Sequence, residues 1–235
     1  MTYTQDERNA LCDLLAELGP DQPTLCPGWR TGDLAAHLVL RERRPDAAAG
    51  VLGGPVAGYT RWVQARLTDR YSFAELVELI RTGPPRLSMF GLPGANERLN
   101  LVEFLVHHED VLRAQPGWLP RKVDPELADM LWDRLSLARL MLRKAPVGVE
   151  LVRADSGEGL TDGTRGGRPH TPDQRGAAGR GRVRITVKAR TPVVTVTADP
   201  VELTLWTMGR TGAADVQMDG ADTDVAALRS DTWRP

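Results

Sequence analysis

The stretch NLVEFLVHHEDVLRA, residues 100 to 114, decides the fold because it is apolar around most of a helix and still carries a line of polar side chains. On a helical wheel of about 100° per residue, Glu103 and His107 lie about 40° apart, one turn above the other. Asn100 and Asp110 flank this pair along the same side. The segment therefore predicts an amphipathic helix whose polar stripe needs a partner.

We interpret the side of this helix that carries Arg98, Glu109 and Arg113 as the solvent side, which turns the stripe toward the protein interior. Burying a carboxylate is costly unless another group compensates its charge. A Glu and a His four residues apart present an oxygen and a nitrogen to one point. A divalent cation at that point would satisfy both side chains.

A third ligand is available from an earlier helix. His37 lies among Leu34, Leu38 and Leu40 on the apolar side of the segment DLAAHLVLRER. Three protein ligands of this kind leave one position open, as in catalytic rather than structural zinc sites. We therefore predict a metal site formed by His37, Glu103 and His107, whereas the neighbouring His108 faces about 100° away from His107 and has another role.

Each of these features also has a simpler interpretation. From spacing alone, a His with a carboxylate neighbour is more often a hydrogen-bonded pair in a protein core than a set of metal ligands. Cys26 could be a further ligand and Trp29 a wall of the site, but a buried loop anchor with an inert thiol is favoured. Asp33 and Asp110 could orient the imidazoles, although helix capping explains Asp33 equally well.

The segment RERRP, residues 41 to 45, follows the predicted His37 ligand and is rich in arginine. Arginine binds carboxylates in a bidentate manner, so these side chains could grip an acidic thiol or substrate. A solvated helix end is the favoured interpretation.

The rest of the chain predicts an α+β protein. Helical periodicity and capping signals run through residues 1 to 145, which we expect to form a metal-binding helical bundle. Beyond Pro146, alternating β-branched and polar residues predict strands of a small α/β domain over residues 146 to 235. Within it, residues 155 to 182 are rich in Gly and Arg and predict a flexible insertion.

Composition limits the classes of partner. The chain has 235 residues and a net charge of -1, which favours no polyanionic partner such as nucleic acid. Its two cysteines lack disulfide-type spacing, and its N-terminus lacks a signal-type or membrane-spanning apolar block. We therefore expect a cytoplasmic protein without a membrane or nucleic-acid partner, while its oligomeric state stays open.

Three stretches resemble the signatures of a known family. LCPGWRTGDLAAHLVLRERRPDAAAG, LNLVEFLVHHEDVLRAQPGW and DPVELTLWTMGR look like those of an actinobacterial metal-binding family of the DinB-like superfamily. Mycothiol-dependent maleylpyruvate isomerases belong to the same superfamily. The stretch from about residue 155 to 182 is longer than the family's usual link between strands.

The resemblance implies a DinB-like four-helix bundle that holds a divalent metal, commonly zinc, with ligands at the positions of His37, Glu103 and His107. It further implies a mycothiol-dependent transferase or isomerase that acts on a small electrophilic molecule, with mycothiol as the thiol cosubstrate. The alternative is a non-catalytic metal-binding protein with a structural or sensing role, in which the ion links the helices.

Overall fold

The computed structural model describes residues 2–48, 57–85, 95–154 and 184–230. The chain divides into two compact units, Met1–Lys122 and Val123–Pro235. The first is helical and the second combines helices with a four-stranded sheet, which confirms the predicted α+β class. The predicted Gly/Arg-rich insertion at residues 155 to 182 lies outside the described residues.

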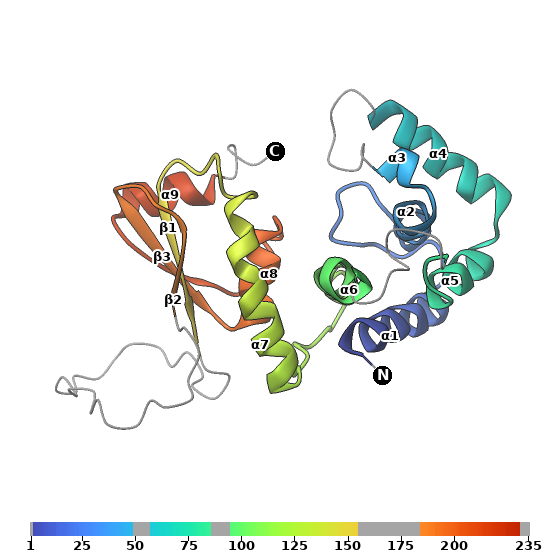
Figure 1. Cartoon of the computed structure of the whole chain (residues 1–235), viewed down its shortest axis with the longest axis horizontal. Helices are drawn as coiled ribbons and strands as arrows, with labels where there is room; N and C mark the ends of the chain where they lie inside the picture. The colour runs from blue at the N-terminus through green and yellow to red at the C-terminus, as the bar shows by residue number, and fades with distance from the viewer. Residues whose placement is uncertain (1, 49–56, 86–94, 155–183, 231–235) are drawn as a thin grey trace. The chain divides into compact units, whose positions relative to one another are not determined.

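The N-terminal unit is a bundle in which α1 packs against α5 and α6, and α2 packs against α4 and α5 (Figure 1). Its described helices are α1 (Tyr3–Leu18), α2 (Thr31–Arg43), the short α3 (Pro45–Ala48), α4 (Ala57–Arg70), α5 (Phe73–Arg81) and α6 (Ala95–Leu112).

Local sequence signals set the ends of these helices. The Ser72 hydroxyl accepts from the Glu75 N–H and the Glu75 carboxylate accepts from the Ser72 N–H, so the predicted capping box begins α5. Gly83 adopts a positive φ of 77° just after that helix, which a side chain would disfavour. These signals fix the direction in which α5 approaches α1 and α2.

Helix α6 is buried on nearly all sides, which corrects one interpretation. Glu109 is 0% and Arg113 is 7% exposed, so neither side chain faces solvent as predicted. Glu109 forms ion pairs with Arg113 at 2.6 Å and with Arg121 at 2.7 Å, and this pairing allows its burial. The side chain of Arg98 lies outside the described residues.

The C-terminal unit is built around a mixed sheet with strand order β2-β1-β3-β4. Strand β1 pairs parallel with β3 and antiparallel with β2, and β4 is antiparallel to β3. Its strands are β1 (Gly148–Arg153), β2 (Arg184–Lys188), β3 (Val193–Ala198) and β4 (Gln217–Asp219), and its helices are α7 (Pro125–Arg134), the 3-10 helix η2 (Leu135–Arg139), α8 (Pro200–Thr207) and α9 (Asp222–Arg229).

The boundary between the units differs from the predicted position near residue 145. Trp132 of α7, with Leu135 of η2, belongs to the same hydrophobic core as Val149 and Val196 of the sheet. The apolar side of α7 is thus buried against the second unit, and the division falls between Lys122 and Val123. Helical periodicity had grouped α7 with the preceding helices because it does not reveal which partner a helix buries.

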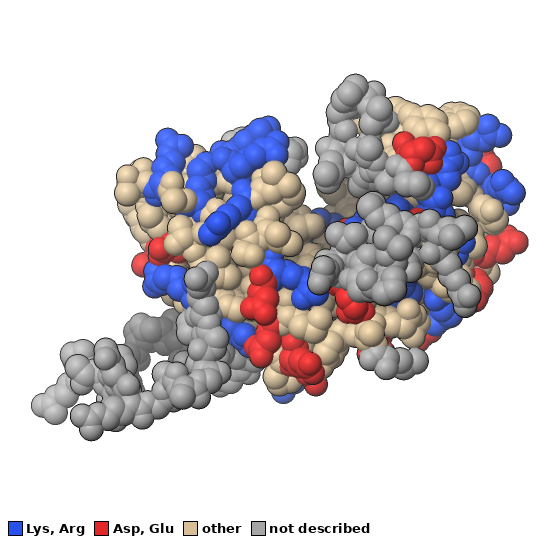
Figure 2. Space-filling model, viewed as in Figure 1, with Lys and Arg blue, Asp and Glu red and all other residues tan. Residues whose placement is uncertain are grey.

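Charged side chains are unevenly distributed over the surface of the two units. On the face shown in Figure 2, basic side chains gather at one end of the C-terminal unit, while the helical unit presents both signs of charge. The overall charge of -1 therefore averages over locally uneven surfaces.

Within the described residues, none of the helices combines the length and the apolar character needed to span a bilayer.

A buried ion pair within the bundle yields the first prediction. Arg8 and Glu42 lie 2.5 Å apart and are 0% and 2% exposed. The change Arg8→Met should lower the free energy of unfolding by about 3–5 kcal/mol because Glu42 loses its buried countercharge. Denaturant unfolding measures this loss. The control Arg81→Met removes the more exposed pair with Asp13 and should have only a slight effect; equal losses would contradict the assignment.

Candidate metal centre

The structure brings the three predicted ligands together between α2 and α6. One atom each of His37, Glu103 and His107 lies within 4.8 Å of the other two. Oε1 of Glu103 is 3.4 Å from Nε2 of His37 and 3.2 Å from Nε2 of His107. As whole residues, His37 and His107 are 3% and 6% exposed, so the group faces the interior, as the helical wheel predicts.

These spacings suit a shared ion. Two ligand atoms about 2.0–2.1 Å from a tetrahedral zinc ion lie about 3.3 Å apart, close to the two separations around Glu103 Oε1. A direct N–H···O hydrogen bond is normally about 2.7–3.2 Å long, so the contact of His37 is longer than expected for a hydrogen bond. The ligand types and spacing therefore fit a divalent ion such as zinc.

Asp110 sets the orientation of His107. Its Oδ2 lies 2.8 Å from Nδ1 of His107, and a carboxylate accepts the proton that Nδ1 donates. In neutral His107 the lone pair is then on Nε2, the nitrogen that faces Glu103. In many proteins, a carboxylate that accepts from the other ring nitrogen holds a metal-binding histidine in this tautomer. Asp110 thus has the orienting position that the sequence suggested.

Arg41 also belongs to this group, although the sequence favoured a solvated helix end for the segment that contains it. Its Nε lies 3.2 Å from Oε1 of Glu103, and it also donates to the Asn100 side chain. The neighbouring Glu42 is 2% exposed and accepts from Asn100 at 2.9 Å. The solvated interpretation is therefore wrong for both residues. The spacing of four residues from His37 to Arg41 is the signal that would have placed Arg41 on the same side of α2.

The loop before α2 borders the site. The Leu25 N–H donates to the Asp110 carbonyl at 2.9 Å and fixes this loop to α6. The Trp29 ring lies 5.0 Å from the His37 ring, so Trp29 walls the site. The Cys26 Sγ lies 3.3 Å from Asp110 Oδ2, and Cys26, His107 and Asp110 form a second group whose ligand atoms are within 4.8 Å.

Two other polar residues take different roles. Nδ1 of His108 lies 3.0 Å from Glu7, which also pairs with Arg121, so His108 belongs to a network on another side of α6. Asp33 accepts from the Arg30 N–H at 2.9 Å and caps α2, which favours the capping interpretation over the orientation of His37.

The electrostatics of the metal-free group are strongly coupled. Burial lowers the pKa of His37 despite its contact with Glu103. Burial alone would raise the pKa of Glu103, but contacts with His107, His37 and Arg41 hold it well below its usual value. For His107, burial is outweighed by hydrogen bonds to Asp110, Cys26 and Glu103, which raise its pKa well above the usual value. Glu103 is thus ionised, and a positive charge is favoured beside it.

A helical bundle that places two histidines and a glutamate inward from two helices is an architecture typical of metal-binding bundles. Residues 4–88 match the family model of the mycothiol maleylpyruvate isomerase N-terminal domain, which belongs to the DinB-like superfamily. The resemblance inferred from the sequence is confirmed over this range, which includes His37 and ends before Glu103. No curated protein and no solved structure matches the chain.

In the metal-free protein, the contacts described above should shift the pKa values of His107 and His37 in opposite directions. NMR titration should give a pKa above 6.5 for His107 and below 6.5 for His37. Asp110→Asn should lower the pKa of His107, because the replacement amide carries no charge to stabilise the imidazolium. An unchanged His107 pKa in the variant would contradict the role of Asp110.

Proposed function

We propose that this protein binds a divalent metal ion, most readily Zn²⁺, through His37, Glu103 and His107. We further propose that it uses the ion, together with a low-molecular-weight thiol such as mycothiol, in a transfer or isomerisation reaction of a small electrophile. The observation that carries the proposal is the position of Glu103 Oε1, 3.4 Å from one imidazole nitrogen and 3.2 Å from the other.

The protonation states support metal binding at this point. The Nδ1–H of His107 is directed at Asp110, so the free lone pair of the neutral ring and the lone pairs of ionised Glu103 face one another. Two facing lone pairs require a positive charge between them, either a proton on the ring or a metal ion. A metal ion would satisfy His37 at the same time, which a single proton cannot do.

The charge of the site favours an anionic fourth ligand. Glu103 and Asp110 together balance the charge of a divalent ion, and Arg41 adds a positive charge beside Glu103. A negatively charged thiolate would be attracted to the ion and to Arg41. Three protein ligands also leave the open coordination position that such a ligand needs.

Access to the site is provided on the side of Glu103 and Arg41. The side chains of both residues are 18% exposed, compared with 4% for His37 and 8% for His107. When bound, the metal would deprotonate a coordinated thiol and so supply a nucleophile at neutral pH. His107, held by Asp110, and Arg41 would keep the ligand set and its charge in place around the substrate.

The identity of the cosubstrate rests on the family. The matched family takes its name from mycothiol and from maleylpyruvate isomerisation, a reaction in which a thiol could add to the electrophilic substrate and then leave, so that the thiol is regenerated. We therefore favour a thiol-dependent enzyme. The alternative is a non-catalytic role in which the ion links α2 to α6 and its fourth position is not used by a thiol cosubstrate.

Variants of the ligands test the metal site directly. His37→Ala, Glu103→Ala or His107→Ala should each lower zinc affinity by more than about 100-fold, because even the loss of an outer-shell partner costs about 10–100-fold. Competition with a chromophoric chelator measures the affinity. Zinc affinity of the wild type should also rise with pH, since a proton on His107 must leave before the ion binds.

The matched control is His108→Ala, which removes the adjacent imidazole that pairs with Glu7. It should retain one zinc ion per chain with affinity close to that of the wild type. Stoichiometric zinc in any of the three ligand variants at wild-type affinity would exclude the proposed ligand set.

Catalysis is tested by thiol-dependent turnover of maleylpyruvate by the zinc-loaded protein. A free thiol with a pKa near 8.5 is only about 3% ionised at pH 7, so full ionisation at the site would raise its reactive fraction about 30-fold. We expect turnover that requires mycothiol and varies little between pH 7 and 8.5. Zinc binding with no turnover, or a rate that follows the ionisation of free thiol, would favour the structural alternative.

A further inference from the structure

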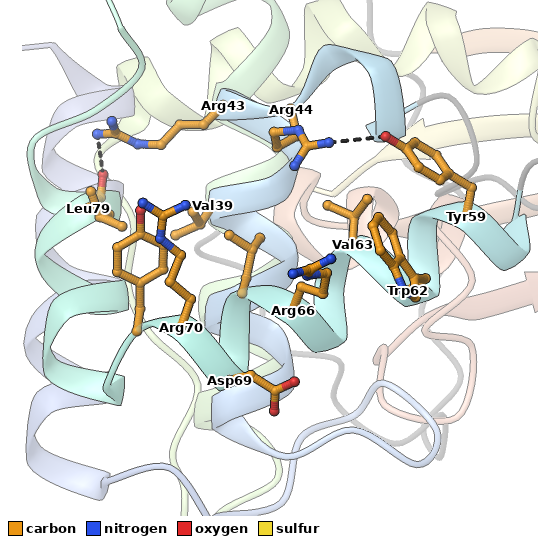
Figure 3. Close-up of a pocket in the computed structure, with 12 residues that line it drawn as sticks. Val39, Arg43, Arg44, Tyr59, Trp62, Val63, Arg66, Asp69, Arg70 and Leu79 are labelled. Atoms are coloured by element: carbon orange, nitrogen blue, oxygen red, sulfur yellow. Dashed lines mark hydrogen bonds between the residues drawn. The ribbon is translucent and has the colours of Figure 1, made fainter.

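A second cavity lies within the helical unit, between α2, α4 and α5 (Figure 3). Its volume is about 720 Å³, within the range of small-molecule sites. None of the three proposed metal ligands lines it. We call it the arginine pocket, after the four arginines in its lining, Arg43, Arg44, Arg66 and Arg70.

Two of these arginines are fixed by the protein itself. Arg44 forms an ion pair with Asp46 at 2.7 Å and donates to the Tyr59 hydroxyl at 3.1 Å. Arg43 donates to the carbonyl oxygens of Leu79 at 3.0 Å and of the glycine that follows α5 at 2.7 Å. Carbonyl oxygens carry no net charge, so the Arg43 cation is not neutralised. Its Nε is moreover buried without a hydrogen-bond partner in the described structure.

The other two arginines project from successive turns of α4. Within the described part of the chain, Arg66 and Arg70 form no hydrogen bond or ion pair, and both side chains are exposed. The Arg66 guanidinium lies 4.9 Å from the centre of the Trp62 ring, and that of Arg70 lies 5.4 Å from the Tyr71 ring. Such contacts hold a guanidinium by its face and leave its N–H edge available for an anion.

The lining of the pocket carries more positive than negative charge. Arg66 and Arg70 are four residues apart on one helix, a spacing at which like charges destabilise the helix. Figure 3 shows the Arg70 guanidinium near Val39 of α2 and the Arg66 guanidinium beside Val63 and Trp62 of α4, so the two cations lie at separate places along the pocket. Asp69 is the one acidic residue in the lining, so it offsets only part of the charge. A ligand with several negative charges would relieve this repulsion.

The remaining lining indicates the form of the ligand. Val39, Val63, Leu67 and Leu79 give the pocket an apolar surface beside its cationic rim. A phosphoryl group presents several acceptor oxygens to guanidinium N–H groups, and it can carry two negative charges. We propose that the arginine pocket binds a phosphorylated small molecule, separate from the metal centre, with Arg66 and Arg70 as its principal phosphoryl ligands and Arg43 supplying long-range positive charge.

Calorimetric titration of the full chain with fructose 1,6-bisphosphate tests the proposal. This probe carries two phosphoryl groups and should bind with a Kd of about 1 mM or lower. The double variant Arg66→Gln/Arg70→Gln should weaken binding by about tenfold or more, as expected when charge-assisted hydrogen bonds are removed. Because neither side chain forms a hydrogen bond or ion pair within the described residues, and only exposed ring contacts are lost, the variant should fold with a Tm close to that of the wild type.

Arg61→Gln is the matched control, since Arg61 is exposed on the same helix but does not line the pocket. It should bind the probe as the wild type does, and so should His107→Ala, which alters only the metal centre. Unphosphorylated fructose should not bind. The proposal is overturned by an absence of binding at millimolar probe, by equal weakening in Arg61→Gln, by loss of binding in His107→Ala, or by equally effective competition from sulfate.

Discussion

The constraint on which the helical unit depends is the burial of charge along α6. Glu109 and Asp110 are both 0% exposed, and Glu103 is largely enclosed between α2 and α6. Such carboxylates can be buried without a large loss of folding free energy only where hydrogen bonds and opposite charges replace the lost hydration. The positions of α1, α2 and the segment after α6 follow from this requirement, because each brings a cationic or hydrogen-bonding side chain to α6.

The two sides of α6 meet this requirement differently. On one side, Glu7 and Glu109 face Arg113 and Arg121, with contacts of 2.6 to 3.1 Å. That set is balanced in charge and closely packed, as expected of a structural network. On the other side, Glu103 contacts Arg41 and two imidazoles at 3.2 to 3.4 Å. The spacing of the atoms around Glu103 is the spacing that the proposed ion requires, whereas His108 belongs to the network on the other side of α6.

The two sites proposed here draw on the same helix in different ways. Along α2, His37 and Arg41 face α6 and contribute to the candidate metal centre. Val39 and Arg43 lie on the side that faces α4 and α5 and line the arginine pocket. A single helix with a central position in the bundle can thus serve two sites, because residues two apart project in directions about 160° different.

The sequence by itself determined the helical segments, the α+β class and the inward direction of Glu103 and His107. Capping residues and helical periodicity are local signals. The helix start at Ser72 and Glu75 and the polar stripe of α6 can therefore be identified from the sequence alone. The tertiary structure decided which partner each charge meets. Glu109 and Arg113 were expected in solvent because charge is normally exposed, but they pair with each other, and Arg121, twelve residues from Glu109 along the chain, supplies a second cation to Glu109. The same holds for Arg41 beside Glu103 and for α7 in the second unit, since contacts between distant residues leave no periodic trace in a single sequence.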